Sequence, residues 1–167
     1  MNWLLFWLLL HIAAAIIAFG PTFVFPLIGS LLEKSPQNAH FAVELMHKME
    51  TGLILPVALT MLVSGTGLIF SADINLTKTL YLDLAIILYL AALAIVFLNQ
   101  LPTTSRLLVL TAAGPPPGAA PGQPPPEVSA LIQKAKVGGM VLTVLLLIII
   151  FLMVIKPGGI TTGPIFG

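Results

Sequence analysis

Residues 137–155 read VGGMVLTVLLLIIIFLMVI, and no side chain in this run carries a charge. A helix that crosses a bilayer needs about 20 mostly apolar residues, because backbone polar groups without partners are costly in lipid. The run therefore predicts a membrane-spanning helix. Lys156, Pro157 and the two glycines that follow are expected to end it.

The rest of the chain has the same character. Of its 167 residues, 58% are hydrophobic and only 8% are charged, whereas about 25% are charged in an ordinary soluble domain. So few charges cannot cover the surface of a water-soluble protein. Three more apolar runs cover residues of about 3–32, 52–70 and 79–98. We therefore expect an all-α polytopic membrane protein, with a single four-transmembrane-helix bundle over residues 1–167.

Prolines interrupt two of these runs. Gly20-Pro21 and Pro26 lie in the second half of the first run. Proline lacks an amide donor and clashes with the preceding turn, so we expect a kink or a break there. The second run contains Pro56, and its helix is expected to begin before the lipid and to enter it near Glu50.

The first run could be mistaken for a secretory signal peptide, since Ala13-Ala14-Ala15 supplies small residues of the kind found at cleavage sites. However, no Lys or Arg precedes it, and the apolar residues continue well past that point. We therefore expect a retained helix.

Residues 114–126 read GPPPGAAPGQPPP and form a proline-rich linker between the third and fourth runs. Seven prolines in thirteen residues exclude helix and sheet and favour extended polyproline II. We interpret the segment as a semi-rigid spacer. A docking site for a proline-binding partner is the alternative.

Lysine and arginine predict the orientation in the membrane. The loops over residues 33–51 and 99–136 carry five of these residues, against two on the opposite side. Cytoplasmic loops are enriched in Lys and Arg, so we expect these loops in the cytoplasm and both termini outside, in a bacterial cytoplasmic membrane. The five are Lys34, Lys48, Arg106, Lys134 and Lys136, and the two are Lys78 and Lys156.

Composition also excludes several functional classes. A net charge of +1 leaves no surplus of Lys and Arg to neutralise phosphates, so we expect no nucleic-acid partner. The chain has no Cys, which excludes disulfides, thiolate metal sites and Cys nucleophiles. It contains no Walker A loop, nucleophile elbow, HExxH motif or dinucleotide fingerprint.

His11 is the clearest candidate for a functional residue, because an ionisable side chain inside a membrane is costly and indicates function by default. It lies about 12 Å along the helix from Trp3, at about 1.5 Å per residue. Asp83 lies a few residues into the third run, which starts on the same side of the membrane, so the two are expected at similar depth. A carboxylate that pairs with one ring nitrogen would leave the other for a ligand or metal. Alternatively, His11 only bonds a neighbouring helix and Asp83 reaches the interface beside Tyr81.

A second cluster precedes the second run. His40, Glu44 and His47 lie at positions i, i+4 and i+7 and are expected to share one helix face. Glu44 and His47 have the spacing of a di-iron ligand pair, but such a site needs a second copy of that motif and two further Glu. We therefore favour a solvated cytoplasmic face with Glu44–Lys48 and His47–Glu50 contacts. Glu50, at the lipid boundary, is the member most worth testing.

Small residues gather in the second run at Ser64-Gly65-Thr66-Gly67. Such residues let a neighbouring helix, or a flat cofactor, approach the backbone closely. Gly65 and Gly67 are the candidates for this approach, and the sequence does not choose between a helix and a cofactor.

Two stretches carry a family resemblance, namely LHIA at residues 10–13 and FGPTFVFPL at residues 19–27. Together with a second span that contains Pro56, Gly65 and Gly67, they resemble a bacterial family of predicted integral membrane proteins of unknown function. The resemblance covers most of the chain, the proline-rich linker excepted. It implies a four-helix membrane protein.

More distantly, the layout is similar to HemJ-type protoporphyrinogen oxidases and to copper-resistance membrane domains. Those oxidases have a His early in helix one and a Met-Glu at the entry to helix two, which His11 and Met49-Glu50 match. The resemblance implies haem b as a cofactor and His11 as a candidate ligand of the haem iron. Gly20-Pro21 replaces aromatic and basic residues of the oxidases, which argues against oxidase activity more than against the fold.

These residues support two hypotheses of different kinds. In the first, the protein binds haem or another redox cofactor through His11, with help from Asp83 and with room at Gly65 and Gly67. In the second, it is a non-catalytic accessory or scaffold subunit of a larger membrane complex, with a membrane protein or a second copy as partner. The sequence identifies no reaction and no substrate, and the lipid bilayer is its one evident partner.

Overall fold

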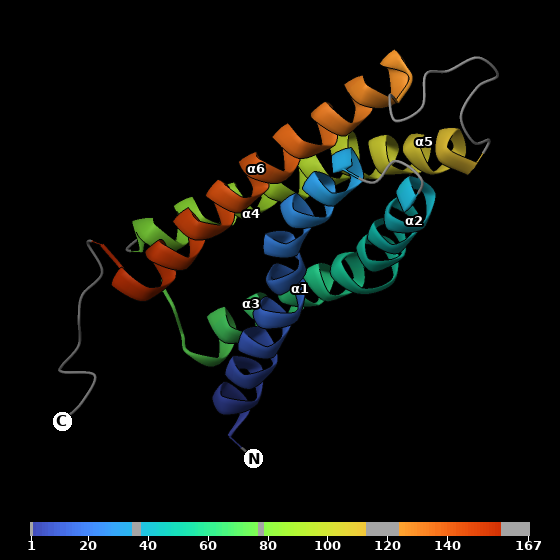
Figure 1. The fold of residues 1–167 in the computed structure, drawn as a ribbon. Coiled ribbons are helices and arrows are strands. Elements are labelled where there is room, and N and C mark those ends of the chain that lie inside the picture. Colours follow the sequence, from blue (N-terminus) through green and yellow to red (C-terminus); the bar gives the residue numbers. More distant parts are fainter. Residues whose placement is uncertain (1, 35–37, 77–78, 113–123, 158–167) are drawn as a thin grey trace.

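The structure, a computed structural model, describes residues 2–34, 38–76, 79–112 and 124–157, and all regular structure within them is helical. Figure 1 shows the arrangement of the helices. In chain order they are α1 (Trp3–Lys34), α2 (Ala39–Met49), η2 (Glu50–Ile54), α3 (Leu55–Ser71), α4 (Leu80–Ile95), η4 (Val96–Gln100), α5 (Leu101–Ala112) and α6 (Pro126–Ile155), where η marks a π-helical turn.

The two π-helical turns do not interrupt the helices in which they lie. The chain is helical from Ala39 to Ser71 through η2 and from Leu80 to Ala112 through η4. With Trp3–Ser30 and Pro126–Ile155, this makes four helices that are long and apolar enough to cross a membrane. The predicted all-α fold with four membrane helices is confirmed.

The helices reach beyond the predicted spans at one end of the bundle. We call this the loop end, where α1 and α5 end and where α2 and α6 begin. A helix of 33 residues is about 50 Å long, whereas the hydrocarbon layer is about 30 Å thick. The extra turns pack on one another around Val43, Leu107 and Val128, which are buried. This small core explains why the helix that begins at Leu80 continues past residue 98 to Ala112 and why α6 starts well before residue 137.

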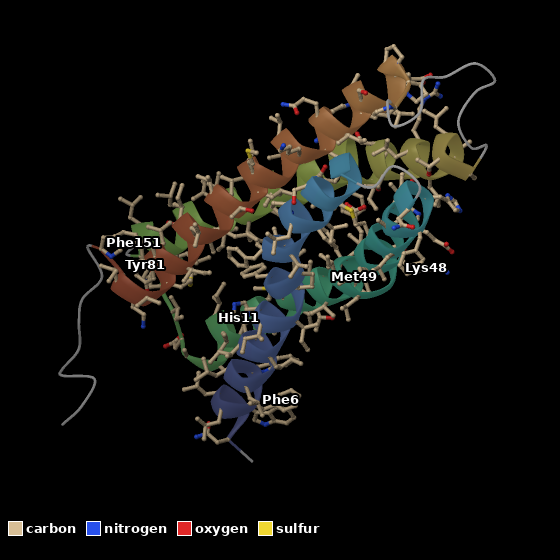
Figure 2. All side chains as sticks on the ribbon, in the orientation of Figure 1. Phe6, His11, Lys48, Met49, Tyr81 and Phe151 are labelled. Atoms are coloured by element: carbon tan, nitrogen blue, oxygen red, sulfur yellow. The ribbon has the colours of Figure 1, made fainter. Side chains whose placement is uncertain are left out.

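Away from the loop end the helices form two arms. We call α1 and α3 the N-arm and α4 and α6 the C-arm, since these pairs pack most closely. The arms diverge in Figure 1, and in Figure 2 Phe6 lies near the end of one arm while Tyr81 and Phe151 lie near the end of the other. Where the arms meet, the Tyr89 hydroxyl donates a 2.7 Å hydrogen bond to the Ala58 carbonyl oxygen. The N-arm and the C-arm are therefore tied together near the middle of the molecule.

Large apolar side chains cover the outside of both arms. Several of these side chains are exposed over more than two thirds of their surface. They include Leu9 and Phe70 on the N-arm, and Leu80 and Leu98 on the long helix that contains α4. In water such a surface would drive aggregation, whereas in hydrocarbon it is the stable arrangement. The bilayer is therefore the environment of this surface.

The predicted break in the first span is absent. Pro21 and Pro26 both lie inside α1, which continues as one helix to Lys34. Each proline removes one backbone hydrogen bond, but α1 packs against both α3 and α6, which hold it in place. Most of the proline-rich segment 114–126 lies outside the described residues, and Pro126 is the first residue of α6, where a missing amide hydrogen costs nothing.

Candidate functional site

His11 lies on α1 at its interface with α3 (Figure 2). Its Nδ1 is 3.0 Å from the hydroxyl oxygen of Ser64, and that hydroxyl donates to the Met61 carbonyl oxygen at 3.2 Å. A hydroxyl has one hydrogen, so we assign the Nδ1–H of His11 as the donor to Ser64. Ser64 is fully buried. The imidazole therefore has a hydrogen-bonding partner on the neighbouring helix.

Asp83 is not part of this interface. It lies in the first turn of α4, on the other arm and close to Tyr81, and it is half-buried. Its backbone amide donates to the Thr79 carbonyl oxygen at 3.2 Å, but its carboxylate makes no hydrogen bond and no ion pair with any described residue. The structure does not bring the predicted His11–Asp83 pair together, because α1 packs on α3 and α4 packs on α6.

The glycine face of α3 is covered by side chains of α1. A Cβ atom at Gly67 would lie 2.6 Å from Trp7 Cε2, and one at Gly65 would lie 3.4 Å from His11 Cε1. Gly65 and Gly67 thus make room for the neighbouring helix and leave no space for a flat ring between α1 and α3. No three His, Asp or Glu side chains among the described residues are grouped so as to hold a metal ion. These residues do not fit a haem in this interface.

The predicted polar face of α2 is directed at α5. His40 Nδ1 lies 3.2 Å from the Thr111 hydroxyl, and His47 Nδ1 lies 3.4 Å from the Thr104 hydroxyl. The predicted Glu44–Lys48 contact is present, with 2.8 Å between Lys48 Nζ and Glu44 Oε1. The predicted His47–Glu50 contact is not formed, because both of these side chains turn to Thr104 instead.

Glu50 is the most deeply buried charged residue among those that the structure describes. Only 5% of its surface is exposed, and its Oε2 accepts a 2.7 Å hydrogen bond from the hydroxyl of Thr104, which is also buried. The contact from His47 to Thr104 extends this into a chain of three polar groups that leads from the α2 surface to the carboxylate. A buried carboxylate costs several kcal/mol unless its environment compensates it. The single hydrogen bond from Thr104 offsets only a small part of this cost for Glu50.

Gln100, the last residue of η4, lies near Glu50 on the helix that runs from Leu80 to Ala112. Its Nε2 donates to the Ala135 carbonyl oxygen at 3.2 Å, while its Oε1 is buried and makes no hydrogen bond with any described residue. The side chain is 93% buried and borders the same cavities as Glu50. A buried acceptor that lacks a partner is rare in folded proteins.

Three helices contribute buried polar side chains at the same distance from the loop end. Thr22 lies twelve residues before Lys34, Glu50 eleven residues after Ala39, and Gln100 twelve residues before Ala112. At about 1.5 Å per residue this is about 16 to 18 Å. We call these three residues, together with Thr104, which donates a hydrogen bond to Glu50, the polar layer.

Two prolines account for the backbone of this layer. Glu50 opens the π-helical turn η2 and Gln100 closes the turn η4. Pro56 and Pro102 each lie two residues beyond these turns, where their missing amide hydrogens and bulky rings disturb regular α-helical bonding. Single π-helical turns are rare and occur frequently at functional sites. Here both widen the helix next to a buried polar side chain.

Two cavities meet at the polar layer. The first, of about 50 Å³, extends toward the loop end and also borders Val43 and Lys136, and we call it the inner cavity. The second, of about 70 Å³, extends between the arms toward Ala58 and Tyr89, and we call it the deep cavity. Each exceeds the roughly 10–15 Å³ that one water molecule needs. Four residues border both cavities, namely Phe25, Glu50, Gln100 and Gly139.

Glycines on α6 close the layer from the fourth helix. A Cβ atom at Gly138 would overlap the Asn99 amide and come within 3.0 Å of Gln100 Oε1, and one at Gly139 would lie 3.6 Å from Gln100 Nε2. The missing side chains let α6 approach η4 closely. They also leave the walls of both cavities lined by backbone at Gly139.

The family described as "Predicted integral membrane protein (DUF2269)" matches residues 5–157. The chain belongs to this family. This membership confirms the resemblance to a family of predicted integral membrane proteins, and it agrees with the four apolar helices and the lipid-facing surface. No curated protein and no solved structure matches the chain.

Sequence reasoning missed Gln100, Thr104 and Thr22. The first two lie beyond residue 98, where the third span was expected to end, so they were assigned to a loop. Pro102 was the available signal, because a proline follows each of the two polar positions, two residues after Gln100 and six residues after Glu50. Thr22 lies between the prolines of α1, where a break was expected.

Proposed function

We propose that the protein is an integral membrane binding protein whose ligand site is the polar layer. The observation that carries this proposal is the position of Glu50, an almost fully buried carboxylate at the junction of two cavities, with a single threonine hydroxyl bonded to it. A group held only for stability would be surrounded by donors. Glu50 instead borders open volume.

The available atoms define the chemistry of the bound group. Among the described residues that border the deep cavity, Glu50 is the one that can carry a charge at neutral pH, while the Gln100 amide nitrogen is already engaged with Ala135. The bound group therefore donates hydrogen bonds or carries a positive charge. An acidic group would place two acids at one site, where only one of them can ionise.

A membrane-soluble carbodiimide tests this site. N,N′-dicyclohexylcarbodiimide reacts with protonated carboxyl groups in apolar surroundings: a carboxyl oxygen adds to the central carbon, and acyl migration to nitrogen leaves a stable N-acylurea. We expect one adduct on the purified protein, lost in Glu50→Gln and retained in the matched variant Glu44→Gln. Intact-protein mass spectrometry gives the readout. An unmodified protein, or an adduct retained by Glu50→Gln, would refute the proposal.

For the orientation, we propose that the loop end faces the cytoplasm of a bacterial cell, with both termini outside the cytoplasmic membrane. The five-to-two distribution of Lys and Arg supports it. Because the chain has no Cys, single cysteines can report it: Asp73→Cys should react with a membrane-impermeant maleimide on intact cells, and Ser129→Cys only after lysis. Both positions are exposed. If Ser129→Cys reacts on intact cells and Asp73→Cys reacts only after lysis, the protein has the opposite orientation.

The two predictions made from sequence remain open to experiment. A haem or another redox cofactor at His11 predicts Soret or other visible absorption of the purified protein that is lost in His11→Ala. The accessory or scaffold role in a larger membrane complex predicts a protein that co-purifies with the chain. The hydrogen bond of His11 to Ser64 and the filled glycine face favour the polar layer over His11 as the site.

A further inference from the structure

We infer that the ligand of the polar layer is a single-chain amphiphile taken from the membrane, with a hydroxyl or amine head at Glu50, the first methylenes of its chain in the deep cavity and the rest of the chain between the arms. The inference rests on the proposed function and specifies its ligand class. Three features of the cavities support it.

The first feature is the chemistry of the deep cavity. Its polar and charged lining, Thr22, Glu50 and Gln100, belongs to the polar layer, apart from Tyr89, whose hydroxyl is bonded to the Ala58 carbonyl oxygen. The remaining wall is apolar. Small side chains at Ala18, Ala58 and Ala92, all buried, leave the volume open. At about 70 Å³ the cavity is smaller than the roughly 150 Å³ that holds one benzene, so it suits the first methylenes next to a polar head, with the rest of the chain continuing between the arms.

The second feature is the direction of the cavity within the membrane. On the loop-end side of Glu50 lie exposed charged residues, including Lys48 two residues earlier in the chain and the Arg106–Glu127 ion pair. On the other side the deep cavity runs along Ala58, Ala92 and Leu146, among apolar helices. A head at Glu50 would thus lie at the boundary of the hydrocarbon, with the chain directed inward. This is the orientation that an amphiphile already has in one leaflet.

The third feature is the route of entry. The deep cavity lies where the N-arm meets the C-arm, it is not sealed from the surface, and beyond it the arms diverge (Figure 1). The outer surfaces of both arms are apolar. An apolar chain can therefore enter from the lipid between the arms without passing a charged group, and the head follows to reach Glu50.

Competition on the unaltered protein tests the ligand class. Hexadecanol should slow the carbodiimide labelling of Glu50 several-fold, whereas hexadecyl sulfate, an anion that does not consume carbodiimides, and the short-chain butanol should leave it unchanged. Equal protection by the sulfate, or no protection by hexadecanol, would overturn the inference. The proposed function would survive that result, because it requires only that Glu50 be labelled.

A photoreactive hexadecylamine, with a diazirine in its chain, then locates the chain. We expect cross-links to residues that line the deep cavity, at least five-fold above those from a hexadecanoic acid probe, and a loss of this preference in Glu50→Gln. Ala92→Phe should fill the cavity and abolish the cross-links, whereas the matched variant Ala91→Phe, at an exposed position, should retain them. Cross-links confined to the outer faces of the arms would overturn the inference, whether or not Ala92→Phe folds.

Discussion

Two regions of this molecule place an ionisable side chain inside a membrane helix, and their surroundings differ. At the interface of α1 and α3, His11 has a hydrogen-bonding partner in the buried Ser64, and glycines bring the helices into contact around it. At the polar layer, Glu50 has one hydroxyl partner, the nearby Gln100 keeps an unpaired oxygen, and two cavities meet. The cost of burying an ionisable group marks both regions. Only the second leaves that cost uncompensated, and this separates a packed interface from a candidate binding site.

The largest expected effect concerns the packed interface. Gly67→Ala should lower the free energy of unfolding by about 1–3 kcal/mol, because the new Cβ overlaps the rigid ring of Trp7. Gly52→Ala is the matched control, since nothing lies within 4 Å of a Cβ there. That change should stabilise the helix by about 0.5–1 kcal/mol. Unfolding of the purified variants in mixed micelles provides the measurement, and equal effects at both glycines would contradict tight packing at Gly67.

The second prediction concerns the polar layer. Glu50→Met replaces a poorly compensated carboxyl by an apolar side chain of similar size, and it should raise the free energy of unfolding by about 1–3 kcal/mol. The same unfolding assay measures it. Ser64→Ala is the comparison from the packed interface and should destabilise. If Glu50→Met destabilises the protein as Ser64→Ala does, Glu50 is a structural residue and the contrast between the two regions fails.

The smallest effect is the coupling between His11 and Ser64. Hydrogen bonds between membrane helices contribute about 0.6 kcal/mol on average and up to about 1.7. A double-mutant cycle with His11→Ala and Ser64→Ala should therefore give a coupling energy in this range. A coupling of zero would show that the recorded 3.0 Å contact does not stabilise the interface.

The four helices could be predicted from the sequence because their apolar runs meet the length that a bilayer requires. Glu50 could be singled out for the same reason, as a charge at the edge of a run. The neighbours of each residue could not be predicted. Depth along a helix suggested Asp83 as the partner of His11, but depth does not determine which helices pack together. Gln100 was missed because the helix continues past the end of its apolar run, where packing at the loop end replaces contact with lipid.

The most direct test of the polar layer compares two carbodiimides on the unaltered protein in its membrane, with peptide mapping of its six acidic residues. One reagent is N,N′-dicyclohexylcarbodiimide, which partitions into lipid, and the other is a water-soluble carbodiimide with a nucleophile. We predict that Glu50 reacts with the first and is protected from the second, while the surface residue Glu44 shows the opposite preference. If Glu50 resists both reagents, or if Glu44 and Glu50 react alike, the polar layer is not a site open to membrane-soluble ligands.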